Sequence, residues 1–246
     1  MVDGFLLFFG DVLYGYFKQL FNTIVKMQAA TQIPFNEPAF GRLLHTAIEV
    51  FAERGFKAAT VREICARANV NVASVNYYFR SKEALYSKAL ALAIQEANQL
   101  YPMVAALDES LPPEQRLALF IDNFLHKLLD DSHLGYHSKL ITREIAEPTK
   151  ALDEIIATAI IPQFDILEDI VRQLLGASAN KPTIERCMLS IMGQCLLFKH
   201  SRSIVERLHP QLIANENAIK LTAEHIARFS LLALNHYDGQ STELEP

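Results

Sequence analysis

The sequence contains no tryptophan and only nine glycines in 246 residues. Proteins rich in strands use glycine in tight turns, and no alternating run of β-branched residues bounded by turn signals is present. Half of the residues are apolar, which is enough to bury one sizeable core, or a small and a medium domain packed together. The sequence therefore predicts an all-α protein.

Cysteine is also scarce, and the three cysteines form no metal-ligand spacing: Cys65, Cys187 and Cys195. Their odd number does not suit a disulfide framework. Each lies in an apolar helical pattern, where a buried free thiol behaves as a small hydrophobic group. This cysteine usage is typical of a reducing compartment, and we predict a cytoplasmic protein.

Catalytic motifs are missing as well. The sequence has no recognisable set of Ser, His and Asp and no glycine-rich phosphate-binding loop. His133 and His137 are four residues apart, but Gly135 between them argues against a continuous helix, and no Glu or Cys completes a ligand set. We predict that the protein is not an enzyme and that it holds no metal and no cofactor.

Residues 1–38 form an extension and linker rich in Phe, Leu and Tyr. Gly10 and Asp11 interrupt the apolar run, so neither a secretory signal nor a membrane-spanning helix is predicted. Two interpretations remain open: an amphipathic helix that packs on the body or lies on a membrane surface, and a translation start at Met27. Membrane contact through residues 1–25 is the less favoured outcome.

The charge is unevenly distributed along the chain, whose formal net charge is −5. Residues 39–88 contain eight Lys and Arg against four Asp and Glu, whereas the rest contains fifteen against twenty-four. The phosphate backbone of DNA attracts local positive charge, so a basic segment in an acidic protein is compatible with DNA binding.

The basic segment begins with two predicted helices. The first has one apolar face, formed by Phe40, Leu43, Leu44, Ala47, Ile48 and Phe51. Gly55 is expected to end this helix in a left-handed conformation. Thr60 and Glu63 have the spacing of a reciprocal capping box, which predicts the start of the second helix.

A tight turn and a third helix follow. Asn69 tolerates the positive φ that such a turn requires. Asn71 can cap a helix that ends near Phe79, with Val75 and Phe79 on its apolar side. Two short helices joined by so tight a turn predict a helix-turn-helix, whose second helix enters the major groove of DNA.

Four motifs lie in and beside these helices: Phe51-Ala52-Glu53-Arg54-Gly55-Phe56, Ala59-Thr60-Val61-Arg62-Glu63-Ile64-Cys65, Tyr77-Tyr78-Phe79 and Ser81-Lys82-Glu83-Ala84-Leu85-Tyr86. Their order and spacing resemble the DNA-binding domain of TetR-family transcriptional regulators. The resemblance implies an all-α TetR-like fold, in which residues 39–88 form a three-helix DNA-binding domain. Residues 89–246 would form a larger helical domain for effector binding and dimerisation.

The resemblance also implies which residues contact double-stranded DNA. Thr60 would cap the second helix and touch phosphate, Arg62 would reach a base or a phosphate, and Lys82 would pair with phosphate. Tyr77 and Tyr78 are adjacent and cannot share one helix face, so one is expected to pack while the other faces DNA. The predicted contacts are Thr60, Arg62, Asn71, Val72, Ala73, Ser74, Asn76, Tyr77, Tyr78 and Lys82.

Small side chains and one amide determine the predicted readout. Ala73 and Ser74 let the backbone approach the bases, and Asn76 can form two hydrogen bonds to adenine. Asn69 replaces the usual turn glycine of the family, and Asn76 occupies a position where the family often has tyrosine. A second arginine of the preceding helix, Arg67, is also expected to contact phosphate rather than to be merely solvated.

Six further helices are predicted after the third. Caps and prolines give their bounds as 81–101, 114–131, 138–147, 149–175, 183–205 and 221–237. Thr149 and Thr183 are the expected caps of two of them, and Pro162 should kink the longest. The last two helices are apolar on more than one face, which indicates burial at the centre of the body or at a dimer seam. A homodimer would hold two DNA-binding domains about 34 Å apart, so that they reach successive major grooves of a palindromic site.

Short motifs in the body are Arg143-Glu144, Glu147-Pro148-Thr149, Ile161-Pro162 and Gly193-Gln194-Cys195. They resemble the TetR-type regulators that have a CecR-like C-terminal domain. This resemblance implies the control of genes for efflux or for a response to xenobiotic compounds.

A small hydrophobic or amphipathic effector is the predicted ligand of the body. The residues expected at its site are Phe124, Tyr136, His137, Arg143, Glu144 and Phe164. Arg143 and Glu144 interrupt an apolar helix, and they could equally pair with neighbouring residues. The predicted function is a ligand-responsive repressor. Two alternatives are a helical DNA-binding protein without an effector and a membrane-associated protein that sequesters a ligand.

Overall fold

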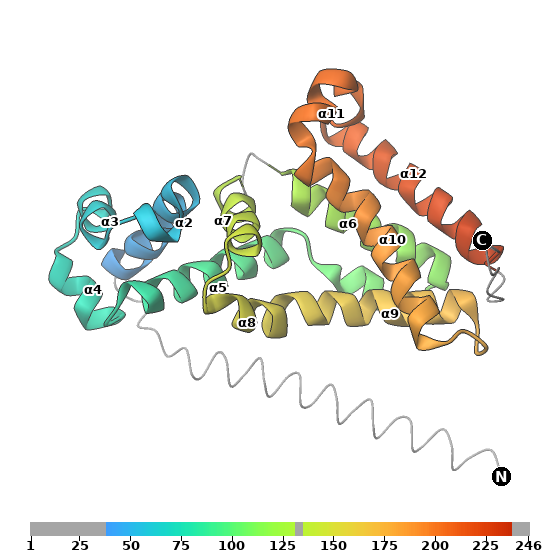
Figure 1. Cartoon of the computed structure of the whole chain (residues 1–246), viewed down its shortest axis with the longest axis horizontal. Helices are drawn as coiled ribbons and strands as arrows, with labels where there is room; N and C mark the ends of the chain where they lie inside the picture. Colours follow the sequence, from blue (N-terminus) through green and yellow to red (C-terminus); the bar gives the residue numbers. More distant parts are fainter. Residues whose placement is uncertain (1–37, 131–134, 238–246) are drawn as a thin grey trace, which may run out of the picture. The chain divides into compact units, whose positions relative to one another are not determined.

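The computed structural model describes residues 38–130 and 135–237, of which all from residue 44 onward belong to one compact unit. Within these ranges the secondary structure is helical and no strand is formed (Figure 1). The prediction of an all-α fold is therefore confirmed. Among the helices of residues 38–130 and 135–237, none has the length and hydrophobicity of a membrane-spanning segment. The predictions for residues 1–37 and for His133 lie outside the described residues.

The DNA-binding segment contains three helices, α2 (Pro38–Ala58), α3 (Val61–Ala68) and α4 (Val72–Tyr78). The Thr60 hydroxyl accepts a hydrogen bond from the Glu63 N–H at 3.1 Å. The Asn71 side chain accepts one from the Ala73 N–H at 2.9 Å. Asn69 lies in the left-handed region with φ 53° and ψ 51°. The caps and the turn between α3 and α4 are thus as predicted.

The sequence predicted that Gly55 ends the first helix, and α2 indeed consists of two helical segments that meet at a kink at Gly55. Its φ of 75° is positive, yet the helix resumes beyond it to Ala58. The Ala59 N–H donates to the Gly55 carbonyl oxygen at 3.1 Å. The residues after Gly55 therefore form a short separate turn of helix, and the first helical segment ends at Gly55 with a positive φ, as predicted.

Two helices follow almost at the predicted positions. Ser81 caps α5 (Lys82–Leu100) by accepting a hydrogen bond from the Ala84 N–H at 3.1 Å. A 3-10 helix, η1 (Met103–Leu107), leads to α6 (Pro113–Leu129), which has proline in its first turn. Proline suits this position because the first N–H groups of a helix have no partner within it.

The next helices differ from prediction at their starts. α7 (Gly135–Ala146) begins three residues before the predicted residue 138, at the glycine that argued against a continuous helix from His133 to His137. Glycine costs little there, because the first turn has few internal hydrogen bonds to lose. The predicted helix 149–175 is divided into α8 (Ala151–Ile155), a π-helical segment η2 (Ile156–Ile160) and α9 (Ile161–Leu175). The wider π turn directly precedes Pro162, which has no N–H to donate to the turn before it.

The last long helices are α10 (Lys181–His200) and α12 (Glu216–Asn235), separated by α11 (Arg202–Leu208) and the 3-10 helix η3 (Pro210–Leu212). The cap of α10 is Asn180, which accepts from the Thr183 N–H at 3.0 Å, so the prediction of Thr183 as the cap is wrong. α10 also ends at His200 rather than near residue 205, and α11 is a separate helix. α12 starts at Glu216, five residues before the predicted residue 221. The prediction placed the start too late because the first turn of the helix is polar and lacks the apolar pattern.

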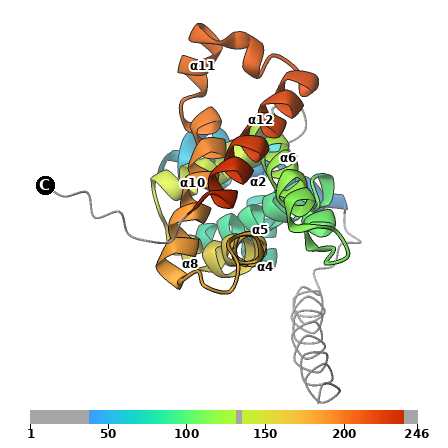
Figure 2. The same ribbon diagram turned by 90° about the vertical axis from the view of Figure 1, so that its right-hand side faces the viewer.

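The main core lies among α6, α9, α10 and α12, which pack against one another. Figure 2 shows α6, α10 and α12 side by side. Residues fully buried in this core include Phe120, Leu125, Leu167 and Val171. α5 packs instead against α7 and α8. The helix that follows the DNA-binding helices therefore packs mainly on α7 and α8, and a hydrogen bond also joins it to α6.

Candidate nucleic-acid interface and effector cavity

The two sides of α4 differ sharply in exposure. Val75 and Phe79 are buried, as their apolar spacing predicted. Asn71, Val72, Ala73 and Asn76 are exposed and Ser74 is half-buried. Tyr77 is 80% exposed, whereas Tyr78 is half-buried. Of the adjacent tyrosines, Tyr77 is thus the one that solvent or DNA can reach.

The two arginines of α3 have different surroundings. Arg67 donates to Glu53 at 2.9 Å and to Glu63 at 2.8 Å, so it joins α3 to α2. The hydrogen bond from Arg67 lowers the pKa of Glu53. Arg62 is exposed and forms no hydrogen bond or ion pair with any described residue. Arg62 is therefore free to contact phosphate, whereas Arg67 already has two carboxylate partners.

Lys82 and Thr60 also interact within the chain. The Lys82 ammonium donates to the Lys57 carbonyl oxygen at 3.3 Å and lies 4.7 Å from the ring centroid of Phe56. Thr60 remains exposed while its hydroxyl caps α3.

Arg80 was not among the predicted contacts. It is exposed directly after α4 with a positive φ of 67°, a conformation that the sequence does not reveal.

A network of hydrogen bonds connects α7 with α5. Glu144 is fully buried, and one of its carboxylate oxygens accepts a hydrogen bond from the Tyr86 hydroxyl at 2.8 Å. Its other oxygen accepts from the Thr149 N–H at 2.8 Å and from the Thr149 hydroxyl at 2.9 Å. Burial, and then the hydrogen bond to Glu144, raise the pKa of Tyr86. Glu144 therefore pairs with neighbouring residues, which was the alternative to lining an effector site.

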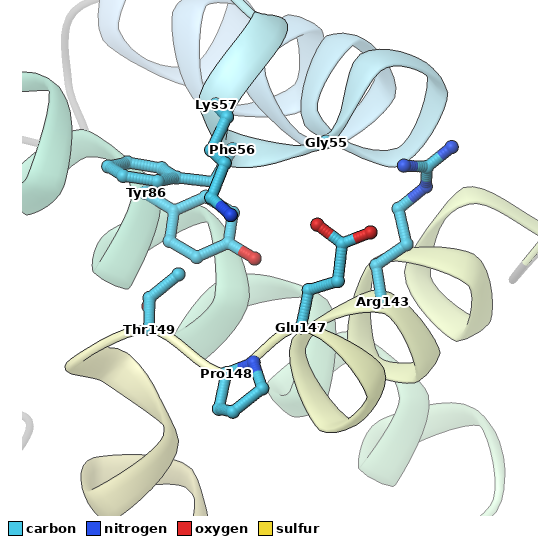
Figure 3. A pocket seen from close by; sticks show the side chains of 8 residues that line it. All are labelled: Gly55, Phe56, Lys57, Tyr86, Arg143, Glu147, Pro148 and Thr149. Atoms are coloured by element: carbon cyan, nitrogen blue, oxygen red, sulfur yellow. The ribbon is translucent and has the colours of Figure 1, made fainter.

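Arg143 extends from α7 toward the end of α2. It donates to the Glu53 carbonyl oxygen at 3.2 Å. A Cβ atom at Gly55 would lie 2.9 Å from the Arg143 Nη1, which could move aside, but the positive φ of 75° at this position favours glycine. A cavity of about 410 Å³ lies beside them, with Tyr86, Glu147 and Thr149 on its wall (Figure 3).

A second cavity, of about 300 Å³, lies within the body. Side chains from α5, α6, α7, α8, η2, α9 and α10 line it, and most of them are apolar. Phe124 and Phe164, two of the six residues expected at the effector site, are among them. Tyr136 and His137 lie elsewhere: Tyr136 approaches Glu53 at 3.4 Å, and His137 lies 2.6 Å from Glu96. Sequence reasoning missed Lys127, which reaches the cavity from α6.

The exposed faces of α10 and α12 carry several large apolar side chains among polar ones. Their exposed large side chains are Leu189, Leu197, Leu221, Phe229 and Leu232. Gln194 of α10 donates to the Ser230 hydroxyl of α12 at 3.2 Å, so the two exposed faces adjoin. A Cβ at Gly193 would meet no other atom within 4 Å. This face is open at its centre to another helix.

Family models match both parts of the chain. Residues 43–89 match the model described as bacterial regulatory proteins, tetR family. Residues 113–234 match the C-terminal domain of the HTH-type transcriptional dual regulator CecR. The two ranges together cover more than half of the chain.

Individual relatives give a consistent result. The CecR protein of Shigella flexneri is 29% identical over 178 residues, which are 69% of this chain and 79% of the relative. The HTH-type transcriptional activator FasR of Mycolicibacterium smegmatis is 30% identical over 141 residues, 57% of this chain and 62% of the relative. Both are described as transcriptional regulators rather than enzymes.

Solved structures share the fold at lower identity. The regulator FadR of Bacillus subtilis, solved in complex with stearoyl-CoA, has a TM-score of 0.59 and 17% identity, covering 78% of this chain and 97% of its own. A TetR-like regulator from Rhodococcus sp. RHA1 has a TM-score of 0.53 and 20% identity, covering 79% and 96%. At these identities the likeness supports the fold alone.

Proposed function

Since this chain belongs to the TetR family of bacterial transcriptional regulators and has a CecR-type C-terminal domain, we propose that it is a ligand-responsive repressor. Residues 39–88 would bind a palindromic operator, and residues 89–246 would dimerise and bind the effector in the cytoplasm. The CecR-like motifs favour genes for efflux or xenobiotic response as targets.

The exposed face of α4 carries the proposal of DNA binding. Asn76 and Tyr77 present hydrogen-bonding groups from a helix whose opposite side, at Val75 and Phe79, is buried. Arg62 is exposed beside this helix and has no partner among the described residues. Phosphate contacts from such arginines would position the helix, and the amide of Asn76 would read a base.

The outer faces of α10 and α12 support a homodimer. Two adjoining helices carry exposed leucines and a phenylalanine. Burying these side chains against a second protomer lowers the free energy and so favours a dimer. Gly193 lets a partner helix approach closely, since a Cβ there would meet no atom of the described residues within 4 Å apart from its own stretch of helix. A two-fold dimer through these helices would bring two DNA-binding domains to one palindrome.

The apolar cavity of about 300 Å³ supports an effector. α7 contributes residues to this cavity and also carries Arg143 and Glu144, which bond to α2 and α5. If α7 can adopt two positions, a ligand that binds the protein more tightly in one of them favours that position. The accompanying change in the DNA-binding helices would be limited by the difference between the two affinities.

Selection of binding sites from random double-stranded DNA tests the proposal most directly. We expect a palindromic site that the protein retards in a gel, with an affinity that falls steeply with salt. A scrambled version of the selected site is the control. Equal affinity for both sequences at physiological salt would contradict specific regulation and favour a DNA-binding protein without a defined operator.

A further inference from the structure

The ionisable side chains of the body cavity all belong to basic residue types. Lys127, Lys199 and His200 line it, whereas its described lining includes no Asp or Glu. Outside residues 39–88, however, the chain has fifteen Lys and Arg against twenty-four Asp and Glu. A basic cavity in an acidic body is the reverse of what composition alone would give, and it favours a ligand with negative charge.

Lys127 is the residue whose surroundings argue most strongly for an anion. It extends from α6, is half-buried, and donates a hydrogen bond to the amide oxygen of Asn98 on α5 at 2.5 Å. Among the described residues no carboxylate forms an ion pair with it. An ammonium group has three donors, and a neutral amide oxygen accepts from only one of them.

Burial has a measurable consequence for this ammonium. It lowers the pKa of Lys127 to about 8. The charged form is thus disfavoured in the cavity, and a carboxylate placed beside it would offset that cost. A charge-assisted hydrogen bond would form there between ligand and protein.

The rest of the cavity is suited to a hydrocarbon. Ile141 and Ile145 of α7 contribute to the wall, together with Ile160 and Phe164. Gln163 also lines the cavity, but its amide already donates to the Ala159 carbonyl oxygen at 3.0 Å. The volume of about 300 Å³ holds on the order of ten non-hydrogen atoms at ~30 Å³ each.

We infer that the body cavity is a site for an amphipathic carboxylate of medium length, whose head group pairs with Lys127 and whose apolar chain packs on the residues of α7 and α9. The inference deepens the proposed function, because it assigns a chemical class to the effector. The proposed ligand class has one negative charge on an otherwise apolar molecule, whose apolar part can be alkyl or aromatic.

A charge series on the unmodified full-length protein tests the ligand class. Decanoate, decanol and decyltrimethylammonium each contain a linear chain of ten carbons and differ in the charge of the head group. We expect calorimetry without DNA to give the tightest binding for decanoate, with decanol weaker by about tenfold or more. The cation should bind more weakly still. Equal binding of decanol and decanoate, preference for the cation, or no binding of decanoate would each overturn the inference.

A matched pair of variants tests the role of Lys127. Lys127→Met keeps the length of the side chain and removes its charge, so decanoate affinity should fall about tenfold or more while decanol affinity is retained. Lys139→Met makes the same change at an exposed position of α7 that does not line the cavity, and it should leave both affinities unchanged. Undiminished decanoate binding by a folded Lys127→Met variant would overturn the inference. If that variant does not fold, the charge series alone decides.

The two proposals fail in different ways. Calorimetry in the absence of DNA reports only on the cavity, and gel retardation without ligand reports only on the DNA-binding face. Decanoate binding by a protein that selects no DNA site would refute the proposed function and leave this site intact. Specific DNA binding without decanoate binding would refute the site and leave DNA recognition intact.

Discussion

The exposed face of α4 and the exposed faces of α10 and α12 differ in chemistry. The first presents the amide of Asn76, the hydroxyl of Tyr77 and, beside it, the guanidinium of Arg62. The second presents leucines and Phe229, which is 57% exposed. Polar groups form hydrogen bonds with water until bases and phosphates take the place of the water molecules. Apolar groups form no such bonds, and their burial away from water is favourable. The first face is therefore suited to a charged polymer and the second to another copy of the chain.

This difference separates two contributions to DNA affinity. The polar face determines how well one DNA-binding domain fits one half-site. The apolar face determines whether two domains bind together, which multiplies affinity without any new contact to DNA. Substitutions on the two faces should therefore weaken DNA binding in distinguishable ways.

The largest effect is expected from Gly193→Glu on the outer face of α10. The backbone can accept a side chain there, since a Cβ would meet no atom within 4 Å, so each protomer should fold normally. A carboxylate at the centre of an apolar interface would be desolvated and would separate the protomers. We expect a monomer by sedimentation and a loss of operator affinity of about hundredfold or more.

The control for this substitution is Ser178→Glu. It adds the same charge at an exposed residue between α9 and α10, away from the apolar face. We expect it to leave both the dimer and the operator affinity intact. A Gly193→Glu protein that stays dimeric would show that the protomers associate through another surface.

The next largest effect is expected from Asn76→Ala, which alters base preference rather than assembly. A bidentate contact contributes about 1–3 kcal/mol of discrimination between bases. Because Asn76 is exposed on α4, the truncation should leave the fold and the dimer unchanged. Repeating the site selection with this variant should relax one position in each half-site. An unchanged consensus would assign the readout to other residues.

A smaller effect is expected from Arg62→Ala, and Arg67→Ala provides the comparison on the same helix. Loss of a phosphate contact should weaken binding to all sequences and reduce the salt dependence by about one unit for each contact. Arg67 is already paired with Glu53 and Glu63, so Arg67→Ala should slightly lower the thermal unfolding midpoint and leave the salt dependence of DNA binding unchanged. Equal reductions of the salt dependence by both variants would contradict this division.

Local signals in the sequence were sufficient for the DNA-binding helices. The caps Thr60 and Asn71 and the turn at Asn69 each depend on residues within three positions, so spacing predicts them. Arg67 could not be assigned in the same way, because its partner Glu53 is fourteen residues away on another helix. The sequence predicted phosphate contact for both arginines, and the fold distinguishes them.

The body was harder to predict, because its cavity is formed by residues distant in sequence. Lys127 and Phe164 lie on different helices, and nothing in the local pattern of either shows that they share one wall. The break after His200 and the polar start of α12 were missed because an apolar pattern gives no boundary where the chain turns in solvent. The C-terminal motifs indicated the type of domain but not which residues line its cavity.

The smallest effect is expected from chemical labelling of thiols on the two sides of α10. Cys195 is on the buried side, and burial raises its pKa to about 12. Only the thiolate reacts, and at pH 8 about one thiol in 10⁴ would be ionised, against roughly a quarter of unperturbed thiols. We therefore expect native Cys195 to resist iodoacetamide at pH 8, with a rate that increases as the pH approaches the pKa.

Gly193→Cys places a thiol two residues away, on the outer side of the same helix. In a dilute, monomeric sample this thiol should be labelled rapidly, and it should become protected as protein concentration rises and the dimer forms. Cys195 should stay unlabelled at every concentration, because its burial belongs to the protomer and not to the dimer. Labelling of the introduced thiol that is independent of concentration would locate the dimer interface away from the outer face of α10.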